Sequence, residues 1–352
     1  MTETLIAPRT HPSELLAIAM RHRADGDLGA ATEAVEQACA ALEGGDHEPI
    51  LVSRARLVRG MVAADRGEHV IASSIFSCVA RSASTGTAWD RLRVQAIVAQ
   101  GVLLRQRARH SESERFLRRA VRLAREPDSR AQAHNELGLT HRRAGRPRRA
   151  WVSFETARRL LERGYVLPHP ELAAVHRNLS GLAHAHGDLT SAVAAARAAL
   201  AIRIGTCAAD DPMILADEEA LVGVLVAGGR ADEALAVLEG LLPAVELRYG
   251  PYHRETAAVL HNFGAAALRA GDLPRAEALL TRCLGVKGRV FGVDHPELAG
   301  THCHLGVVLC TAGDRIGGAG HLRRALAILR AAGDPEHPVA ARCRAALSVA
   351  GL

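Results

Sequence analysis

The sequence Arg269-Ala270-Gly271-Asp272 is one copy of a short phrase that recurs every 42 residues in the second half of the chain. In each copy a glycine stands before a charged residue. The copies are Ala185-His186-Gly187-Asp188, Ala227-Gly228-Gly229-Arg230, Arg269-Ala270-Gly271-Asp272 and Thr311-Ala312-Gly313-Asp314. A fixed period of this length is typical of stacked structural repeats. The sequence therefore predicts a repeat array.

Each recurring glycine has a small residue five positions after it and an apolar residue eight positions before it. The small residues are Ala192, Ala234, Ala276 and Gly318, and the apolar residues are Leu179, Leu221, Phe263 and Leu305. Apolar residues upstream of each glycine fall at helical spacing, which predicts a helix that ends at a left-handed glycine. Asp188, Asp272 or Asp314 is then placed to cap a second helix. Each unit is predicted to be a helical hairpin that buries its apolar face by stacking on its neighbours.

The same spacing extends towards the N-terminus. Further turn positions are Gly145, Ala108, Gly67 and Gly26, and the small residues five positions after them are Ala150, Ser113, Ala72 and Ala31. Eight hairpins are therefore predicted over residues 12–338, after a loose segment at 1–11 and before a capping helix in 339–352. We expect an all-α, right-handed superhelical solenoid that no linker interrupts.

One repeat carries a family signature. Asn135-Glu136-Leu137-Gly138, followed by His141, Gly145, Ala150, Phe154 and Ala157, resembles a tetratricopeptide repeat. The 42-residue period, the pairs His169-Pro170, His295-Pro296 and His337-Pro338, and Asn178-Leu179 resemble the kinesin-light-chain-type variant. Ser180, Val222 and Gly318 depart from the family pattern. The resemblance covers residues 12–338 and implies a binding scaffold, without indicating one particular function.

The composition agrees with a helical, soluble chain. Aromatic residues make up only 3%, and β-branched residues do not form runs, so a sheet is not expected. No apolar run approaches the roughly 20 residues that a membrane helix needs. The first twelve residues lack the apolar segment of a secretory signal. We therefore expect a cytoplasmic protein that does not insert into a membrane.

The motifs of common enzyme and metal chemistry are missing from the sequence. It contains no P-loop, no Gly-x-Ser-x-Gly elbow and no His-Glu-x-x-His helix. The seven cysteines are irregularly spaced and indicate no disulfide framework. His184 with His186, and His302 with His304, are only two residues apart, so on a helix they point about 200° away from each other. No catalytic residue, cofactor or metal site is predicted.

Charge is distributed unevenly along the chain. Residues 51–165 contain 24 arginines against 10 acidic residues, whereas the whole chain has a net charge of +6. A basic segment of this kind attracts either an acidic protein segment or a nucleic-acid backbone. Single-stranded nucleic acids usually need aromatic stacking platforms, and here the aromatics are few and the arginines are spread over both helices of each hairpin. The pattern favours an acidic protein partner, and nucleic acid is the less favoured reading.

The family resemblance implies that first helices form a concave inner wall. Their inner positions lie ten, six and three residues before the turn glycine, a spacing that puts them in one stripe. The candidate partner-binding residues from this stripe and its neighbours are Arg105, Asn135, Arg142, Arg143, Arg177, Asn178, Gly181, His184, Glu219, Gly223, His261, Asn262 and Arg269. Arginine suits carboxylates and asparagine suits peptide amides. A solvated charged face is the alternative interpretation of the same residues.

The sequence thus favours a non-enzymatic scaffold that holds a protein or peptide segment with acidic groups in its groove. Two alternatives stay open. One is a sensory or catalytic small-ligand site in the same groove, built from His184, His261, Cys303 and Cys310. The other is nucleic-acid binding through residues 51–165. The sequence leaves the oligomeric state and the partner's identity undetermined.

Overall fold

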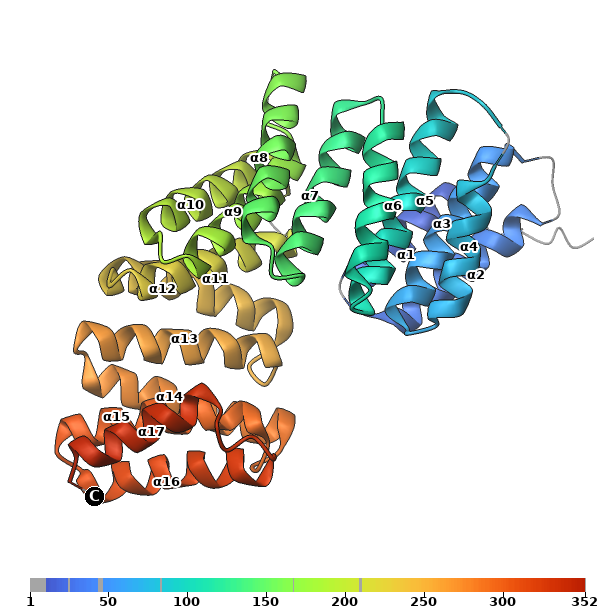
Figure 1. Cartoon of the computed structure of the whole chain (residues 1–352). Helices are drawn as coiled ribbons and strands as arrows, with labels where there is room; N and C mark the ends of the chain where they lie inside the picture. The colour runs from blue at the N-terminus through green and yellow to red at the C-terminus, as the bar shows by residue number, and fades with distance from the viewer. Residues whose placement is uncertain are drawn as a thin grey trace, which may run out of the picture. The chain divides into compact units, whose positions relative to one another are not determined.

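A computed structural model describes residues 11–24, 26–43, 47–82, 84–166, 168–208 and 211–351, and these residues form helices with no strand among them. The helices are α1 (Pro12–Ala24), α2 (Leu28–Leu42), α3 (Pro49–Asp65), α4 (His69–Ala80), α5 (Thr87–Gln106), α6 (His110–Leu123), α7 (Pro127–Arg143), α8 (Pro147–Gly164), α9 (Pro170–Ala185), α10 (Leu189–Thr206), α11 (Pro212–Ala227), α12 (Ala231–Tyr249), α13 (Arg254–Ala270), α14 (Leu273–Phe291), the 3₁₀ turn η1 (Pro296–Leu298), α15 (Ala299–Ala312), α16 (Arg315–Ala331) and α17 (Pro338–Val349). Consecutive helices pack as hairpins (Figure 1). The predicted all-α repeat architecture is confirmed.

The contacts group these helices into two compact units. The first unit ends at Leu182, within α9, and the second begins at Ala183. The predicted loose segment 1–11 lies almost wholly outside the described residues, because only His11 is described there. The predicted capping helix is present as α17, where Val339, Ala340 and Cys343 are buried against the last hairpin.

The turn position of every hairpin has a left-handed backbone. Gly187, Gly229, Gly271 and Gly313 have φ angles of 77°, 72°, 82° and 100°, as the 42-residue phrase predicts. The weakest match to the pattern, Ala108, also has a positive φ, 57°, and is the one non-glycine residue of the described chain with this conformation. The turn geometry is therefore imposed by the packing of the hairpin even where the glycine is missing.

The second helices begin at the predicted aspartate caps. Asp188 Oδ1 accepts from the Ser191 N–H at 3.1 Å, and Asp272 and Asp314 make the equivalent bonds. Several first helices are capped by histidine. The imidazole Nδ1 accepts from the backbone N–H two residues on, at 3.2 Å in each case, at His169, His253, His295 and His337. Each histidine therefore satisfies a backbone donor that the helix leaves unpaired.

The two helices of each hairpin approach closely because small residues face large ones. All the small residues five positions after the turn are buried, and Ala192, Ala234 and Ala276 are 0% exposed. A second series lies seven positions before the turn, where a glycine packs under a large side chain of the following helix. The pairs are Gly60 with Phe76, Gly101 with Leu117, Gly138 with Phe154, Gly264 with Leu280 and Gly306 with Leu322. A Cβ atom at any of these glycines would lie 2.5–2.7 Å from its partner, so the helices would have to separate.

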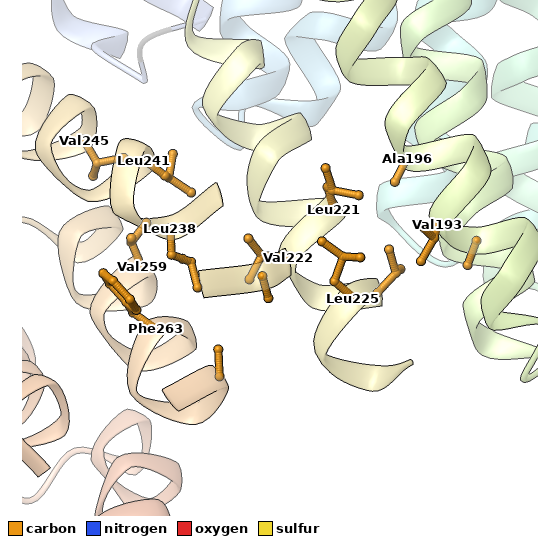
Figure 2. Close-up of a cluster of buried hydrophobic side chains, with 14 residues drawn as sticks. Val193, Ala196, Leu221, Val222, Leu225, Leu238, Leu241, Val245, Val259 and Phe263 are labelled. Carbon is orange, nitrogen blue, oxygen red and sulfur yellow. The ribbon is translucent and has the colours of Figure 1, made fainter. Parts of the chain in front are cut away.

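The core of the second unit continues from hairpin to hairpin. Figure 2 shows Val193 of α10, Leu221 and Leu225 of α11, Leu238 of α12 and Phe263 of α13 in one buried cluster. Similar clusters join α1 to α3 and α3 to α5 in the first unit. Each hairpin therefore buries its apolar face against the next one, which is the condition for a repeat array to fold.

Helix α10 contradicts one expectation drawn from composition. Its 18 residues, Leu189–Thr206, are long and apolar enough to cross a membrane by length and hydropathy. A core helix of a soluble protein meets the same criterion, and α10 contributes Val193 and Ala196 to the core of the second unit. Its Arg203 is buried and donates to Asp217 at 2.8 Å.

Three positions refine the helix boundaries and packing. Pro127 is the first residue of α7, where proline suits the first turn. The chain from Pro296 begins with a 3₁₀ turn and becomes α-helical at Ala299. Arg275 is half-buried, stacks over the Phe263 ring at 4.6 Å and donates to Glu239.

We expect the substitution Ala108→Gly to stabilise the protein by about 1 kcal/mol, because glycine does not carry the left-handed strain of a Cβ atom. Ala194→Gly is the control, since Ala194 is exposed inside α10 and glycine there costs about 1 kcal/mol. Urea denaturation midpoints measure both changes. If Ala108→Gly lowers the midpoint as Ala194→Gly does, the turn assignment at Ala108 is wrong.

We expect Gly264→Ala to destabilise the protein by about 1–3 kcal/mol through overpacking against Leu280. Gly285 lies inside α14 with no atom within 4 Å of an added Cβ, so Gly285→Ala is expected to stabilise the protein by up to about 1 kcal/mol. In thermal melts, the melting temperature is therefore expected to fall for Gly264→Ala and to rise for Gly285→Ala. A rise in melting temperature for both would show that helix propensity, not the close approach, dominates at Gly264.

Candidate functional site

The first unit has an apolar groove along its first helices. The groove has a volume of about 440 Å³ and is lined by residues of α1, α3, α5 and α7, together with Phe76 of α4. Its lining residues are Met20, Arg23, Arg54, Leu57, Val58, Met61, Ala64, Asp65, Phe76, Gln95, Val98, Ala99, Val102, Leu103, Gln106, Gln132 and Glu136. Met20, Leu57, Met61, Val98 and Val102 lie at the inner positions that the family resemblance implies. The first helices therefore present a face in this unit where apolar residues lie beside charged and amide side chains.

The second unit has a pocket of about 460 Å³ along the equivalent face of its own helices. Its lining residues are Val222, Gly223, Val226, His261, Asn262, Ala265, Leu268, Arg269, Cys303, His304, Val307 and Arg342. They come from α11, α13, α15 and the capping helix α17. A Cβ atom at Gly223 would meet nothing within 4 Å, so the glycine leaves open space on the midline of the pocket.

Two stacked histidines form part of the pocket in the second unit. The ring centroids of His261 and His304 are 5.0 Å apart, and His261 Nδ1 is 3.0 Å from the Thr301 hydroxyl oxygen. Burial, His304 and more distant cations lower the pKa of His261 to about 3. Burial and the Arg342 and Arg269 guanidinium groups lower the pKa of His304 to about 4. Both rings are therefore neutral at pH 7, and the positive charge of the pocket comes from its arginines.

Arg269 and Arg342 give this pocket its charge. Both side chains are exposed, and neither forms an ion pair with any residue that the structure describes. The amide of Asn262 lies on the same lining. Guanidinium groups bind carboxylates, and a side-chain amide can pair with a peptide group. The pocket therefore combines an apolar hollow with groups that can recognise an anionic, peptide-like ligand.

The predicted arginines of the first unit are arranged differently. Arg105 donates to the Glu136 carboxylate at 2.5 Å and to its backbone carbonyl at 3.2 Å, so its charge is already paired. Arg142 and Arg143 are exposed at the end of α7. Partial burial and the charges of Arg143 and Arg105 lower the pKa of Arg142. None of the three arginines lines the groove of the first unit.

The predicted asparagines bind each other. The Asn178 amide donates to the Asn135 side-chain oxygen at 2.8 Å, which connects α9 to α7. At Gly181 an added Cβ would lie 3.3 Å from Arg142 Nη1, so this glycine leaves room for the arginine side chain. These residues join neighbouring repeats within the first unit, and each of the two asparagines has a structural contact that sequence reasoning did not anticipate.

The predicted site residues as a whole fall into two groups. Gly223, His261, Asn262 and Arg269 line the pocket of the second unit. Arg105, Asn135, Arg142, Arg143, Arg177, Asn178, Gly181, His184 and Glu219 lie outside both cavities described above. Sequence reasoning missed His304 and Arg342. His304 occupies the same position in its repeat as Asn262, nine residues before the turn glycine, and this equivalence could have identified it. Arg342 is on the capping helix, outside the repeat register.

The two cysteines named for the small-ligand alternative, Cys303 and Cys310, both lie on α15. Cys303 is buried beside Cys343 of α17, and a hydrogen bond with Cys303, together with burial, raises the pKa of the Cys343 thiol. Cys310 instead lies against Gly318, where an added Cβ would be 2.4 Å from its sulfur. In the described residues no group of three or more histidines, cysteines, aspartates or glutamates is arranged to hold a metal ion.

Comparison with known proteins gives matches to repeat proteins. A family model for the tetratricopeptide repeat matches residues 215–289. No curated protein sequence matches the chain. Kinesin-light-chain TPR-like repeats from Podosopora anserina share 20% identity over 56% of this chain and 97% of theirs, with a TM-score of 0.51. The family model thus identifies tetratricopeptide repeats at residues 215–289, and the solved structure shows that the hairpin fold of this chain is like that of tetratricopeptide-like repeat proteins.

Two other solved structures cover more of the chain. A STAND signal transduction ATPase with a tetratricopeptide repeat sensor, from Pyrococcus horikoshii, is 11% identical and covers 89% of this chain and 45% of its own, with a TM-score of 0.68. A Rap protein complexed with Competence and Sporulation Factor is 13% identical and covers 96% of this chain and 87% of its own, with a TM-score of 0.56. At 11% and 13% identity, these similarities show that the folds are alike and do not extend to function.

Glu219 of α11 is expected to make stability depend on pH. Burial and the nearby Glu255 raise its pKa to about 7 from the ordinary 4.5. The folded state therefore binds more protons than the unfolded state between these values, so stability falls as pH rises through that window. We expect Glu219→Gln to reduce the loss of stability between pH 5 and pH 8, measured by urea denaturation at both pH values. Glu277→Gln, at an exposed position of α14, is the control, and an unchanged pH dependence in Glu219→Gln would contradict the assignment.

Proposed function

We propose that the protein is a non-enzymatic scaffold whose inner helices bind an extended protein or peptide segment. The observation that carries this proposal is the shape of the two cavities. Each is lined by the same face of four successive inner helices, α1, α3, α5 and α7 in one unit and α11, α13, α15 and α17 in the other. A cavity that runs along successive helices suits an extended segment.

The dimensions of these cavities suit a peptide. Packed helices lie about 8–10 Å apart, so four successive helices span roughly 25 Å. An extended chain advances about 3.3–3.6 Å per residue, so a span of this length accommodates about seven residues. Side chains of such a segment alternate in direction, and those that face the protein would meet the apolar residues of the lining.

The chemistry of the second unit favours a segment with acidic groups. Arg269 and Arg342 are unpaired among the described residues, whereas their surroundings are apolar or neutral. A carboxylate would bind them with charge-assisted hydrogen bonds. An apolar side chain next to that carboxylate would occupy the hollow over Gly223. The peptide's backbone amides would pair with Asn262.

The comparisons support a binding role. The Rap protein with the same fold was solved in complex with Competence and Sporulation Factor, and the repeat region of the STAND ATPase is described as a sensor. Both precedents concern other proteins at low identity. They support recognition of a ligand by this architecture, and the acidic preference rests on Arg269 and Arg342 alone.

Nucleic-acid binding is the second candidate, and one surface favours it. On α6, Arg115, Arg118, Arg119 and Arg122 surround Phe116 at the edge of a hollow of about 320 Å³. Of these four, Arg118 is paired, with Glu114 at 2.7 Å. The single partly buried aromatic gives little surface for base stacking, so a phosphate backbone would bind here with steep salt dependence.

The proposed function is tested by selecting twelve-residue peptides from a random displayed library against the full chain and measuring the selected peptides by fluorescence anisotropy. We expect peptides that combine Asp or Glu with a neighbouring apolar residue. Arg269→Glu and Arg342→Glu should each weaken binding at least tenfold, because each replaces an attraction with a repulsion.

Arg330→Glu is the matched control, since Arg330 is an exposed arginine near the end of α16 and lies outside the pocket. Selected peptides that bind all three variants equally would contradict the pocket assignment. No selected peptide, together with nanomolar and salt-tolerant binding of a defined oligonucleotide, would replace the proposal with the second candidate.

A further inference from the structure

Two histidines face each other between α15 and α16, the helices of the last hairpin, and lie outside the pocket of the second unit. His302 of α15 and His321 of α16 have their Nδ1 atoms 2.9 Å apart. Their ring centroids are 5.1 Å apart, and the ring planes are inclined by 30°. Both side chains are half-buried, so water and small ions can reach them. The two residues are 19 positions apart in the chain and meet only because the helices pack together.

The packing of the hairpin sets the position of both rings. Each histidine is followed in the chain by a buried core residue, Cys303 or Leu322, and these neighbours set the rotation of their helices. The helices also approach closely here, since an added Cβ at Gly306 would lie 2.7 Å from Leu322 Cγ and 2.8 Å from the Gly318 carbonyl oxygen. The distance between the histidines is therefore a property of the hairpin core.

This distance suits a hydrogen bond between the rings, and it is also the separation of two neighbouring ligands of one metal ion. Imidazole nitrogens bind late first-row metals at about 2.0–2.1 Å. Two nitrogens in neighbouring positions of a square-planar or octahedral ion are then about 2.8–3.0 Å apart, whereas in a tetrahedral zinc ion they are about 3.3–3.4 Å apart. The observed 2.9 Å fits the first arrangement.

We propose that His302 and His321 form a two-histidine site for Ni²⁺ or Cu²⁺ that links α15 to α16, with water in the remaining coordination positions. Without an ion, one ring donates its Nδ1 proton to the other Nδ1. When the ion binds, that proton moves through solvent to Nε2 of its own ring, and both Nδ1 lone pairs turn to the metal. Both rings stay neutral, and the exchange releases no net proton.

The surroundings of the pair allow a cation. The nearby Arg324 guanidinium is paired with Asp294 at 2.5 Å, which offsets its charge. Because no third protein ligand is arranged in the described residues, the site has modest affinity and depends on the preformed geometry. Helix α15 also carries Cys303, His304 and Val307 of the pocket in the second unit, so an ion at His302 would stiffen one wall of that pocket.

The test titrates Ni²⁺ into the full chain, without an affinity tag, by calorimetry at neutral pH. Ni²⁺ is the probe because the seven cysteines would reduce Cu²⁺. We expect one ion per chain, at least tenfold tighter than Zn²⁺, and a rise of a few degrees in melting temperature at saturation. His302→Asn and His321→Asn should each lose at least tenfold in affinity. His184→Asn, at an exposed histidine of α9, should bind as the original chain does.

Circular dichroism in the presence of a chelator shows whether each variant is folded, and His321→Gln is a second variant should His321→Asn unfold. The proposal is overturned if the chain binds no Ni²⁺, if both histidine variants bind it unchanged, or if Zn²⁺ binds more tightly. In the first case the 2.9 Å contact is a structural hydrogen bond only. None of these results depends on peptide binding, so the proposed function is tested separately.

Discussion

The close approach of the two helices within each hairpin is the constraint on which the rest of this structure depends. Two small residues make it possible, one five positions after the turn and one seven positions before it. At Gly138 an added Cβ would come within 2.5 Å of the Phe154 ring, and at Gly264 within 2.5 Å of Leu280. Interiors packed at this density tolerate few changes in volume. The glycine costs helix propensity, about 1 kcal/mol relative to alanine, and the packing of a large side chain over it offsets that cost.

This packing leaves part of the inner face of the first helices open. Each hairpin buries one face against its partner helix and another against the next repeat, so the inner face is less constrained, although Arg105 and Asn135 have structural partners there. In the first unit it carries methionines and valines beside charged and amide side chains, and in the second unit it combines small residues with Asn262, Arg269 and the two stacked histidines. One fold thus presents two surfaces of different chemistry. A functional hypothesis has to be argued from these surfaces and not from the repeat itself.

Internal pairing decides which charges are available to a partner. The basic segment has a large excess of arginine, yet several of its arginines are already engaged, such as Arg105 with Glu136 and Arg158 with Glu155. Arg269 and Arg342 belong to the less basic part of the chain but have no such partner among the described residues. Ion pairs at exposed positions contribute little to stability, so their main effect is to decide which guanidinium groups remain free to bind a ligand. Net charge along the sequence is therefore a poor guide to the site.

The sequence by itself determined the repeat architecture. The pattern consists of turn glycines, aspartate caps and small residues. These act through local backbone geometry and helix packing, which depend on residues close in the chain. The repeat register that they predict includes the turn at Ala108. The sequence also placed Gly223, His261, Asn262 and Arg269 on or beside one stripe, because helical periodicity puts equivalent positions of successive repeats on one face. Only the tertiary structure decided which polar groups are already paired, as Asn135 is with Asn178, and which residues outside the register join the site, as Arg342 does. It alone brought His302 within 2.9 Å of His321, since the distance between side chains on different helices is set by how those helices pack.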